Sequence, residues 1–310
     1  MKDTRTAYTG AIECGRAALL SLDEKRHVRF DADNRKSAVF LDLDGTFWDR
    51  ENVEESTWRA IHKAQENGHL VFVNTGRTPD GIPQFLWEAG MNGFSLCTGM
   101  ILCAADGTVL ESNLLDADQA RAMENYLISQ NSGYALEQSF VSFHDEQYAR
   151  RRAERFKAEG RVDKWHSKPM AEMKPEDYNA LLKIIFDTNH EFPIEPAAAK
   201  MGYDLLVYES SYTAEGGKSG KFSGELTDAR KNKAKSMPEL LRVCVDNPQD
   251  YRIVAMGDST NDVSMLAAAE IGVAMGNGSM DVKETAEMIT DDIHEDGLYN
   301  AFERLGLLKM

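Results

Sequence analysis

The first part of the chain alternates between short apolar runs and segments with apolar side chains at helical spacing. Residues 38–43 are hydrophobic except at position 42, which is typical of a parallel strand covered on both faces. Residues 56–64 place Trp58, Ile61 and Ala64 on one helical face, and residues 70–73 form the next apolar run. A strand, a helix and a second strand within about 35 residues predict a parallel crossover unit.

The same alternation returns near the end of the chain. Apolar runs at residues 252–256 and 271–275 predict two strands, with a helix over residues 263–269 between them. A helix over residues 279–287 and a short strand over residues 288–290 follow. We therefore expect both ends of the chain to be pieces of one parallel α/β sheet.

The middle of the chain has a different pattern. Residues 101–110 predict a hairpin that turns at Asp106 and Gly107. Amphipathic helices follow near residues 116–130 and 145–159, and strands at residues 183–187 and 203–208. We expect an α+β domain, residues 98–221, inserted into a sheet domain made of residues 1–97 and 222–310. Residues 1–36 are an N-terminal extension with one helix near residues 11–22.

Composition narrows the classes of partner. The 310 residues carry a formal net charge of −16, which argues against nucleic acid or an anionic membrane as a partner. No run approaches the ~18 apolar residues of a membrane span. The four cysteines form no CxxC pair, so we expect reduced thiols and a cytoplasmic location. They are Cys14, Cys97, Cys103 and Cys244.

Two aspartates stand at the carboxyl end of the first predicted strand. Asp42 and Asp44 are two positions apart, so both side chains can face one site, and Gly45 allows a sharp turn after them. Ligand sites in open parallel sheets lie at this end of the strands. Two carboxylates there repel each other unless a cation or a proton intervenes. The alternative is two surface aspartates before a turn; a calcium loop is excluded because its glycine would have to come sixth.

A second acidic loop, with Asp258 and Asp262, follows the strand at residues 252–256. Asp262 can also be read as the N-cap of the next helix. Asp42, Asp44 and Asp258, all at strand ends of one sheet, would form an oxygen-rich cluster suited to Mg²⁺.

Two further segments offer groups for an anion. Thr75, Gly76 and Arg77 end the second predicted strand, where a hydroxyl and backbone N–H groups could hold a phosphoryl oxygen, although an ordinary turn has the same composition. The run at residues 229–235 holds several basic side chains, of which one lysine could reach the carboxylates. Lys231, Lys233 and Lys235 are the candidates, and a solvated helix start is the alternative.

These motifs together resemble the haloacid dehalogenase (HAD) superfamily, and more narrowly its Cof-type, subclass IIB phosphatases. The resemblance rests on DLDGT from Asp42, TGR from Thr75, a lysine that best matches Lys233, and GDSTND from Gly257. It implies a Rossmann-like HAD core with an inserted α+β cap domain. It also implies a Mg²⁺-dependent phosphatase of small phosphorylated metabolites, in particular sugar phosphates.

The resemblance assigns a role to each acidic residue. Asp42 would be the nucleophile that forms an aspartyl-phosphate, and Asp44 the acid and base for the leaving group and for water. Mg²⁺ would bind the Asp42 carboxylate, the main-chain carbonyl of Asp44 and Asp258, with Asp262 direct or through water.

It also assigns the phosphate contacts. Thr75 and Asn261 would hold phosphoryl oxygens, together with Gly76 and Arg77 of the same TGR motif. Lys233 would offset charge on Asp42 and the phosphate.

Some features leave other interpretations open. A phosphomutase of the same fold would share every motif, and a non-catalytic phosphate- or metal-binding protein is the alternative from another class. Residues 150–168 are locally basic, which predicts either a solvated helix face or a patch that attracts anionic substrates. The glycine-rich run at residues 216–220 lacks the first glycine of a nucleotide P-loop and favours a hairpin tip instead.

Overall fold

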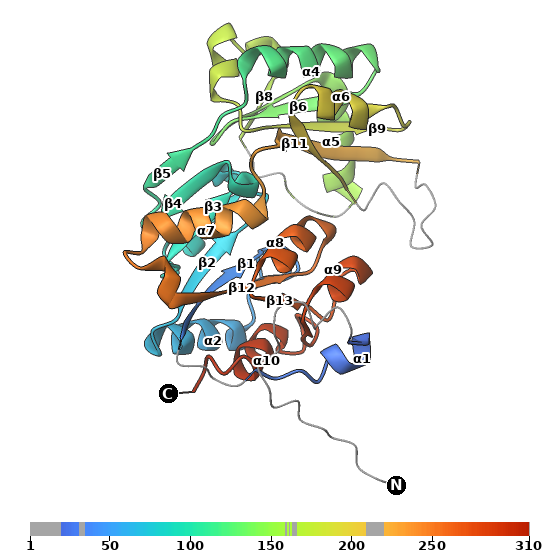
Figure 1. Ribbon diagram of the computed structural model, residues 1–310. Coiled ribbons are helices and arrows are strands. Elements are labelled where there is room, and N and C mark those ends of the chain that lie inside the picture. The colour runs from blue at the N-terminus through green and yellow to red at the C-terminus, as the bar shows by residue number, and fades with distance from the viewer. Residues whose placement is uncertain are drawn as a thin grey trace.

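The computed structural model describes residues 20–30, 35–158, 160, 162, 166–208 and 220–309, which form two sheets with helices packed on them (Figure 1). The predicted helix over residues 11–22 lies largely outside the described residues, and α1 (Leu22–Lys25) begins at its end. The glycine-rich residues 216–219 also lie outside them.

Eight strands in the described residues make up the larger sheet, in the order β14-β13-β12-β1-β2-β3-β4-β5. The strands from β14 to β3 pair in parallel, whereas β4 and β5 continue the sheet antiparallel. Their bounds are β1 Lys36–Leu41, β2 Leu70–Asn74, β3 Gly93–Leu96, β4 Ile101–Ala104, β5 Val109–Ser112, β12 Tyr251–Gly257, β13 Ile271–Ala274 and β14 Met288–Ile289.

Helices cover both faces of this sheet, as the continuous apolar strands require. Val39 and Leu41 of β1 pack with α2 (Glu55–Glu66) and α10 (Gly297–Arg304), while Ala38 and Phe40 pack with the helices of the opposite face. Those helices are α7 (Lys233–Cys244), α8 (Val263–Ala268) and α9 (Met280–Thr285). The predicted α/β class is confirmed. Short helical turns complete the connections: α3 Gln84–Trp87, η2 Pro79–Gly81, η3 Cys97–Gly99, η7 Pro248–Asp250 and η8 Thr260–Asp262.

The smaller sheet has the strand order β10-β11-β9-β6-β7-β8 and is antiparallel except between β7 and β8. Helices α4 (Ala117–Ser129) and α6 (Ile194–Lys200) pack on one face, and α5 (Glu146–Ala158) lies against the other (Figure 1). The strands are β6 Gly133–Glu137, β7 Ser142–His144, β8 Ser167–Pro169, β9 Lys183–Thr188, β10 Tyr203–Val207 and β11 Phe222–Asp228, with turns η4 Met170–Glu172 and η5 Pro175–Ala180.

Strand pairing departs from the predicted boundaries at residues 97/98 and 221/222. The hairpin β4–β5 forms as expected but extends the larger sheet through β3, and β11 pairs with β9 and β10 in the smaller one. The apolar pattern of a strand does not reveal which sheet it joins. We propose that the core and the inserted domain, hereafter the cap, meet at residues 113–116 and 229–232.

Candidate active site

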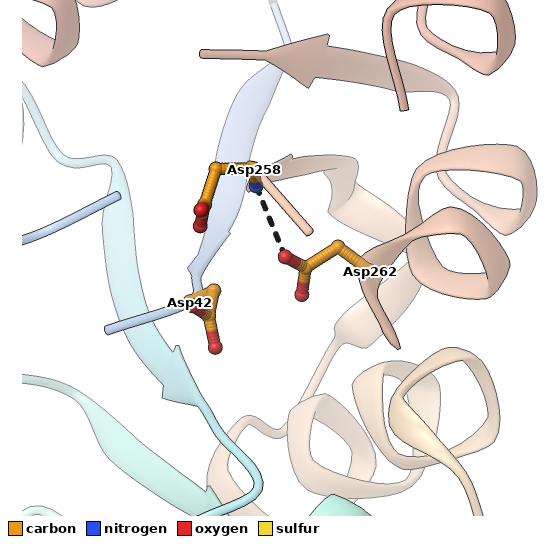
Figure 2. A group of neighbouring side chains, drawn as sticks. All are labelled: Asp42, Asp258 and Asp262. Carbon is orange, nitrogen blue, oxygen red and sulfur yellow. Dashed lines mark hydrogen bonds between the residues drawn. The ribbon is translucent and has the colours of Figure 1, made fainter. Parts of the chain in front are cut away.

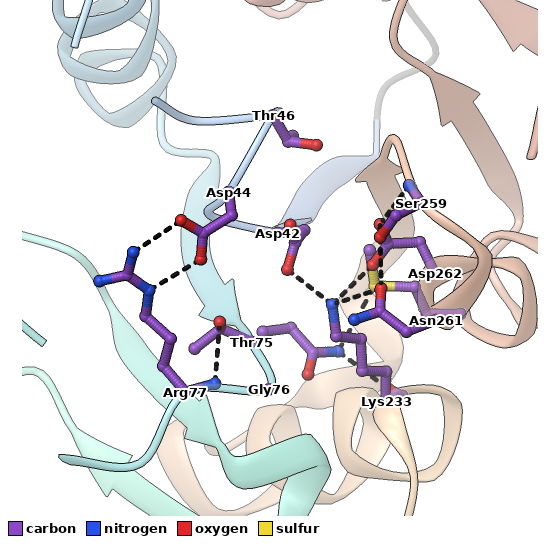
Figure 3. A network of polar contacts seen from close by, with 12 residues as sticks. Asp42, Asp44, Thr46, Thr75, Gly76, Arg77, Lys233, Ser259, Asn261 and Asp262 are labelled. Atoms are coloured by element: carbon purple, nitrogen blue, oxygen red, sulfur yellow. Dashed lines mark hydrogen bonds and ion pairs between the residues drawn. The ribbon is translucent and has the colours of Figure 1, made fainter. Parts of the chain in front are cut away.

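The carboxyl ends of β12, β1 and β2 lie side by side, so the loops that follow them meet at one edge of the core sheet (Figure 3). A pocket of about 370 Å³ opens there, between this edge and the cap. Core residues along it are Asp42, Asp44, Thr75, Gly76, Arg77, Ser259, Thr260 and Asn261. Cap residues along it are Lys183, Leu206, Val207, Tyr208 and Glu225.

Asp42 is held rigidly at the base of this site. Its backbone N–H donates to the carbonyl of Met256 (3.0 Å), and its carboxylate Oδ1 accepts from Lys233 Nζ (2.6 Å). Burial, with the neighbouring carboxylate of Asp262, raises the pKa of Asp42 well above its usual range, and the charge of Lys233 opposes this rise only in part. An anionic Asp42 therefore needs more positive charge than Lys233 supplies.

Lys233 is the lysine that reaches the carboxylates. It is the first residue of α7, directly after the N-cap Asn232, and its buried Nζ contacts Asp42 and Asp262, each at 2.6 Å. The two carboxylates outweigh the effect of burial and raise the pKa of Lys233. Lys231 instead pairs with Glu239 (2.8 Å), and Lys235 reaches backbone carbonyls at the surface.

The side chain of Asp262 stabilises the loop after β12 by hydrogen bonds. Its Oδ2 accepts the backbone N–H groups of Asp258 (3.0 Å, dashed in Figure 2) and Ser259 (3.1 Å), and its Oδ1 accepts from Lys233. Asp262 stands at the N-cap position of α8, but its side chain makes no cap hydrogen bond to that helix. It fixes the loop that presents Asp258.

Gly45 lets this loop approach the end of β1. Its φ of +87° is left-handed, and a Cβ at this position would lie 2.3 Å from Asp258 Oδ2. Thr46 Oγ1 donates to Asp258 Oδ1 (2.9 Å), and Asn277 donates to the carbonyl of Gly45 (2.8 Å). Any larger residue at position 45 would push the two acidic loops apart.

Three carboxylates form a cluster that fits a divalent cation. One oxygen each from Asp42, Asp258 and Asp262 lie within 4.8 Å of one another (Figure 2). Lys233 offsets only one of their three charges, and oxygen donors of this kind are those that hard divalent cations prefer. Because Asp262 already accepts from Lys233 and two backbone N–H groups, its predicted contact with the metal fits better through water than directly.

Asp44 turns away from this cluster toward Arg77 (Figure 3). Arg77 donates to both of its oxygens, Nε to Oδ2 at 2.7 Å and Nη2 to Oδ1 at 2.6 Å, and Trp48 Nε1 donates to Oδ1 at 3.0 Å. Burial alone would raise the pKa of Asp44, but the hydrogen bonds and charge of Arg77 outweigh it and lower that pKa. Arg77 was predicted as a phosphate contact, but it contacts Asp44, the predicted acid and base. Trp48, whose ring lies under the guanidinium of Arg77, was not predicted as a site residue.

The loop after β2 and Asn261 supply hydrogen-bond donors beside Asp42. Within the described part of the chain, the backbone N–H of Gly76 has no acceptor. The same holds for the side-chain NH₂ of Asn261, whose oxygen accepts from Ser259 Oγ (2.8 Å). Thr75 is buried, and its Oγ1 accepts the backbone N–H of Arg77 (3.2 Å). Donors of this kind suit a phosphoryl oxygen.

Sequence reasoning missed the cap side of the pocket. Lys183 was noticed only as the start of a strand, and Glu225 fell in a segment assigned to the core. The signal was present in β9, because Lys183 begins a largely apolar strand. Its side chain lies on the same face of the strand as those of every second residue. None of the described residues of the basic segment lines the pocket, and Arg151 and Arg155 pair with Asp187 at 3.6 and 3.7 Å.

Comparison with known proteins agrees with this geometry. A family model described as haloacid dehalogenase-like hydrolase matches residues 39–302. The chain belongs to this family. The resemblance to HAD hydrolases is therefore confirmed. Among the described residues, no helix is both long and apolar enough to cross a membrane.

Individual relatives cover nearly the whole chain. YkrA of Bacillus subtilis is 26% identical over 282 residues, which span 87% of this chain and 98% of YkrA. The 5-amino-6-(5-phospho-D-ribitylamino)uracil phosphatase YcsE of Bacillus subtilis is 25% identical over 271 residues, 85% of this chain and 93% of YcsE. A solved structure described as the HAD subclass IIB sugar phosphatase BT4131 shares the fold, with a TM-score of 0.68 and 21% identity over 88% of this chain and all of that one.

Proposed function

We propose that the protein is a Mg²⁺-dependent phosphatase of small phosphorylated metabolites, in particular sugar phosphates, which acts through an aspartyl-phosphate on Asp42. The observation that carries this proposal is the buried carboxylate of Asp42. Lys233 orients this carboxylate, which faces a pocket lined with hydrogen-bond donors suited to a phosphate. The names of YcsE and BT4131, which give a ribityl phosphate and sugar phosphates as their substrates, support the substrate class.

In the first step, Asp42 attacks the phosphorus of the phosphomonoester, and the bond from phosphorus to the leaving oxygen breaks. Lys233 keeps Asp42 oriented, while Thr75, Gly76 and Asn261 bind the phosphoryl oxygens. Mg²⁺, held by the Asp42 carboxylate, the main-chain carbonyl of Asp44 and Asp258, would supply positive charge where an anionic carboxylate meets an anionic phosphate.

Asp44 handles protons in both steps. It gives a proton to the leaving oxygen first and then accepts one from the water that attacks the phosphorus of the aspartyl-phosphate, which releases phosphate and regenerates Asp42. Arg77 favours the carboxylate form of Asp44, the form needed in the second step. In the first step the substrate phosphate competes for Arg77, and Asp44 is released to carry a proton.

A panel of phosphate esters tests the proposal. The purified chain is assayed for phosphate release from several sugar phosphates and from nitrophenyl phosphate, with Mg²⁺ or with EDTA. We expect turnover that depends on the metal and returns when Mg²⁺ is restored. Transfer of phosphate between positions of one sugar without release would identify a phosphomutase, and binding without any turnover would identify a binding protein.

The predicted cytoplasmic location stays a prediction.

A further inference from the structure

The cap wall of the pocket carries a buried cluster of charges. In the antiparallel pair of β6 and β9, Glu137 lies directly opposite Lys183, and Glu225 of β11 lies opposite Ile185. Residues 183 and 185 share one face of β9, so all these side chains stand on the sheet face away from α4 and α6. Lys183, Glu137 and Glu225 are each at least nine-tenths buried.

The charge of Lys183 is already paired with two carboxylates of the cap. Its Nζ lies 2.9 Å from Glu225 Oε2, 3.5 Å from Glu137 Oε2 and 3.0 Å from the carbonyl of Gly76 in the core. The contacts with Glu225 and Gly76 are hydrogen bonds, whereas Glu137 Oε2 is an ion-pair partner that accepts no hydrogen bond within the described residues. The lysine therefore fixes the carboxylates and joins the cap wall to the loop after β2.

Glu225 is left with one oxygen toward the pocket. Its Oε2 accepts from Lys183 and from the hydroxyl of Tyr208 (3.1 Å). Its Oε1 has no donor within the described part of the chain and lies 3.6 Å from where a Cβ on Gly76 would stand. Because Gly76 belongs to the loop proposed to hold the phosphoryl group, Oε1 lies close to the first atoms of the leaving group.

Arg77, the other cation along the described edge of the pocket, is also paired with a carboxylate. Arg77 makes its bidentate contact with Asp44, and in the proposed reaction it is available only to the transferred phosphate. A second anionic group on the substrate would face Glu225 without a counter-charge, and like charges brought together weaken binding. A hydroxyl or an amine would instead donate to Oε1.

We propose that Glu225, oriented by Lys183 and Tyr208, selects phosphomonoesters whose leaving group is a neutral polyol or carries an amine, and rejects those with a second anionic group. This inference rests on the proposed phosphatase function and specifies the substrate class of that site. Glu225 is a specificity residue, because it contacts the leaving group and takes no part in the transfer itself.

Matched substrates test this selection. We would measure kcat/KM for hydroxyethyl phosphate against phosphoglycolate, and for glycerol phosphate against phosphoglycerate, since each pair differs mainly in the charge of the leaving group. The native chain should prefer the neutral member by at least about tenfold, mostly through KM. In Glu225→Gln the preference should fall below about threefold, chiefly because the anionic member binds better.

Controls separate this inference from the proposed function. Asp118→Asn removes one negative charge at a side chain that is 96% exposed, and should leave the ratio unchanged. Glu225→Asp keeps the charge and should keep the preference. Turnover of nitrophenyl phosphate reports whether each variant is folded and catalytic. An equal or reversed preference in the native chain, or an unchanged ratio in a Glu225→Gln variant that hydrolyses nitrophenyl phosphate, would overturn the inference. No turnover of any ester by the native chain would overturn the phosphatase proposal instead.

Discussion

The core edge and the cap wall both bury charged side chains, but they balance them differently. At the core edge, three clustered carboxylates face one lysine, and burial together with the neighbouring carboxylates raises the pKa of Asp42. In the cap wall, Lys183 bonds two carboxylates, and the charge of Arg152 also acts on one of them, Glu137. Two cations therefore stand against two carboxylates in the cap wall, although both oxygens of Glu137 lack a hydrogen-bond partner in the described residues, whereas one cation stands against three carboxylates at the core edge.

From this difference we expect the core edge to carry out the chemical step and the cap wall to select the substrate. A site with uncompensated negative charge binds a cation and can then approach a phosphate. A wall whose charges satisfy each other keeps one geometry and discriminates by what it presents to the leaving group. Substitutions at the core edge should therefore change the rate of the chemical step, whereas substitutions in the cap wall should change stability and substrate preference.

The largest expected effect is at Asp42. In Asp42→Asn the nucleophile is lost, so kcat for phosphate release should fall by at least about 10⁴-fold, as for other covalent nucleophiles. Initial rates with nitrophenyl phosphate and a thermal melt would be measured together. A folded variant that retains more than a hundredth of the activity would place the nucleophile elsewhere.

Loss of Asp258 should act through the metal. Asp258→Asn should raise the Mg²⁺ concentration for half-maximal rate by at least about 100-fold, because a charged oxygen donor is replaced by a neutral one. Titration of the rate with Mg²⁺ measures this. The cap variant Glu225→Gln is the matched control, since it also removes one carboxylate from the pocket, and its Mg²⁺ requirement should not move.

Removal of Arg77 should shift the pH profile. Arg77 lowers the pKa of Asp44, and without it burial raises that pKa. Since Asp44 must be ionised to activate water, the acid limb of the kcat profile should move to higher pH in Arg77→Met. Arg121, which stacks on Tyr178 as Arg77 does on Trp48, gives the control Arg121→Met. Identical shifts in both variants would contradict the assigned role of Arg77.

Substitution of Lys183 should have the smallest effect on the rate of hydrolysis. Lys183→Met leaves Glu137 and Glu225 buried without their cation, which should lower the free energy of unfolding by about 3 kcal/mol. Hydrolysis of nitrophenyl phosphate below the melting temperature should change less than about tenfold. Chemical denaturation measures the first quantity. Unchanged stability would mean that the cap wall is not balanced as described.

The sequence predicted the parts whose signals are local. Both crossover units, the helix at 116–130 and the loops that carry Asp42 and Asp258 follow from apolar spacing and the residues at strand ends, and the structure has these elements. The motif order was also enough to favour Lys233 over Lys231 and Lys235, and the structure places Lys233 Nζ on Asp42.

What could not be predicted depends on contacts between distant segments. Residues 101–110 were expected in the inserted domain and residues 222–228 in the sheet domain, whereas β4 and β5 extend the larger sheet and β11 joins the smaller one, because a strand's own pattern does not reveal its partners. The contact of Arg77 with Asp44 joins positions 33 residues apart, and that of Lys183 with Glu225 joins positions 42 apart. Such pairs are decided by strand register and tertiary packing.

The central claim is that Asp42 carries the phosphoryl group, and an acid quench tests it most directly. Asp44→Asn with Mg²⁺ and labelled nitrophenyl phosphate, whose leaving group departs without a proton, should accumulate a phosphoryl adduct, because the base for its hydrolysis is absent. Peptide mapping should place the label on Asp42, and the double variant Asp42→Asn with Asp44→Asn should hold none. Turnover by the native chain with no label on Asp42, or with equal label in the double variant, would contradict the account.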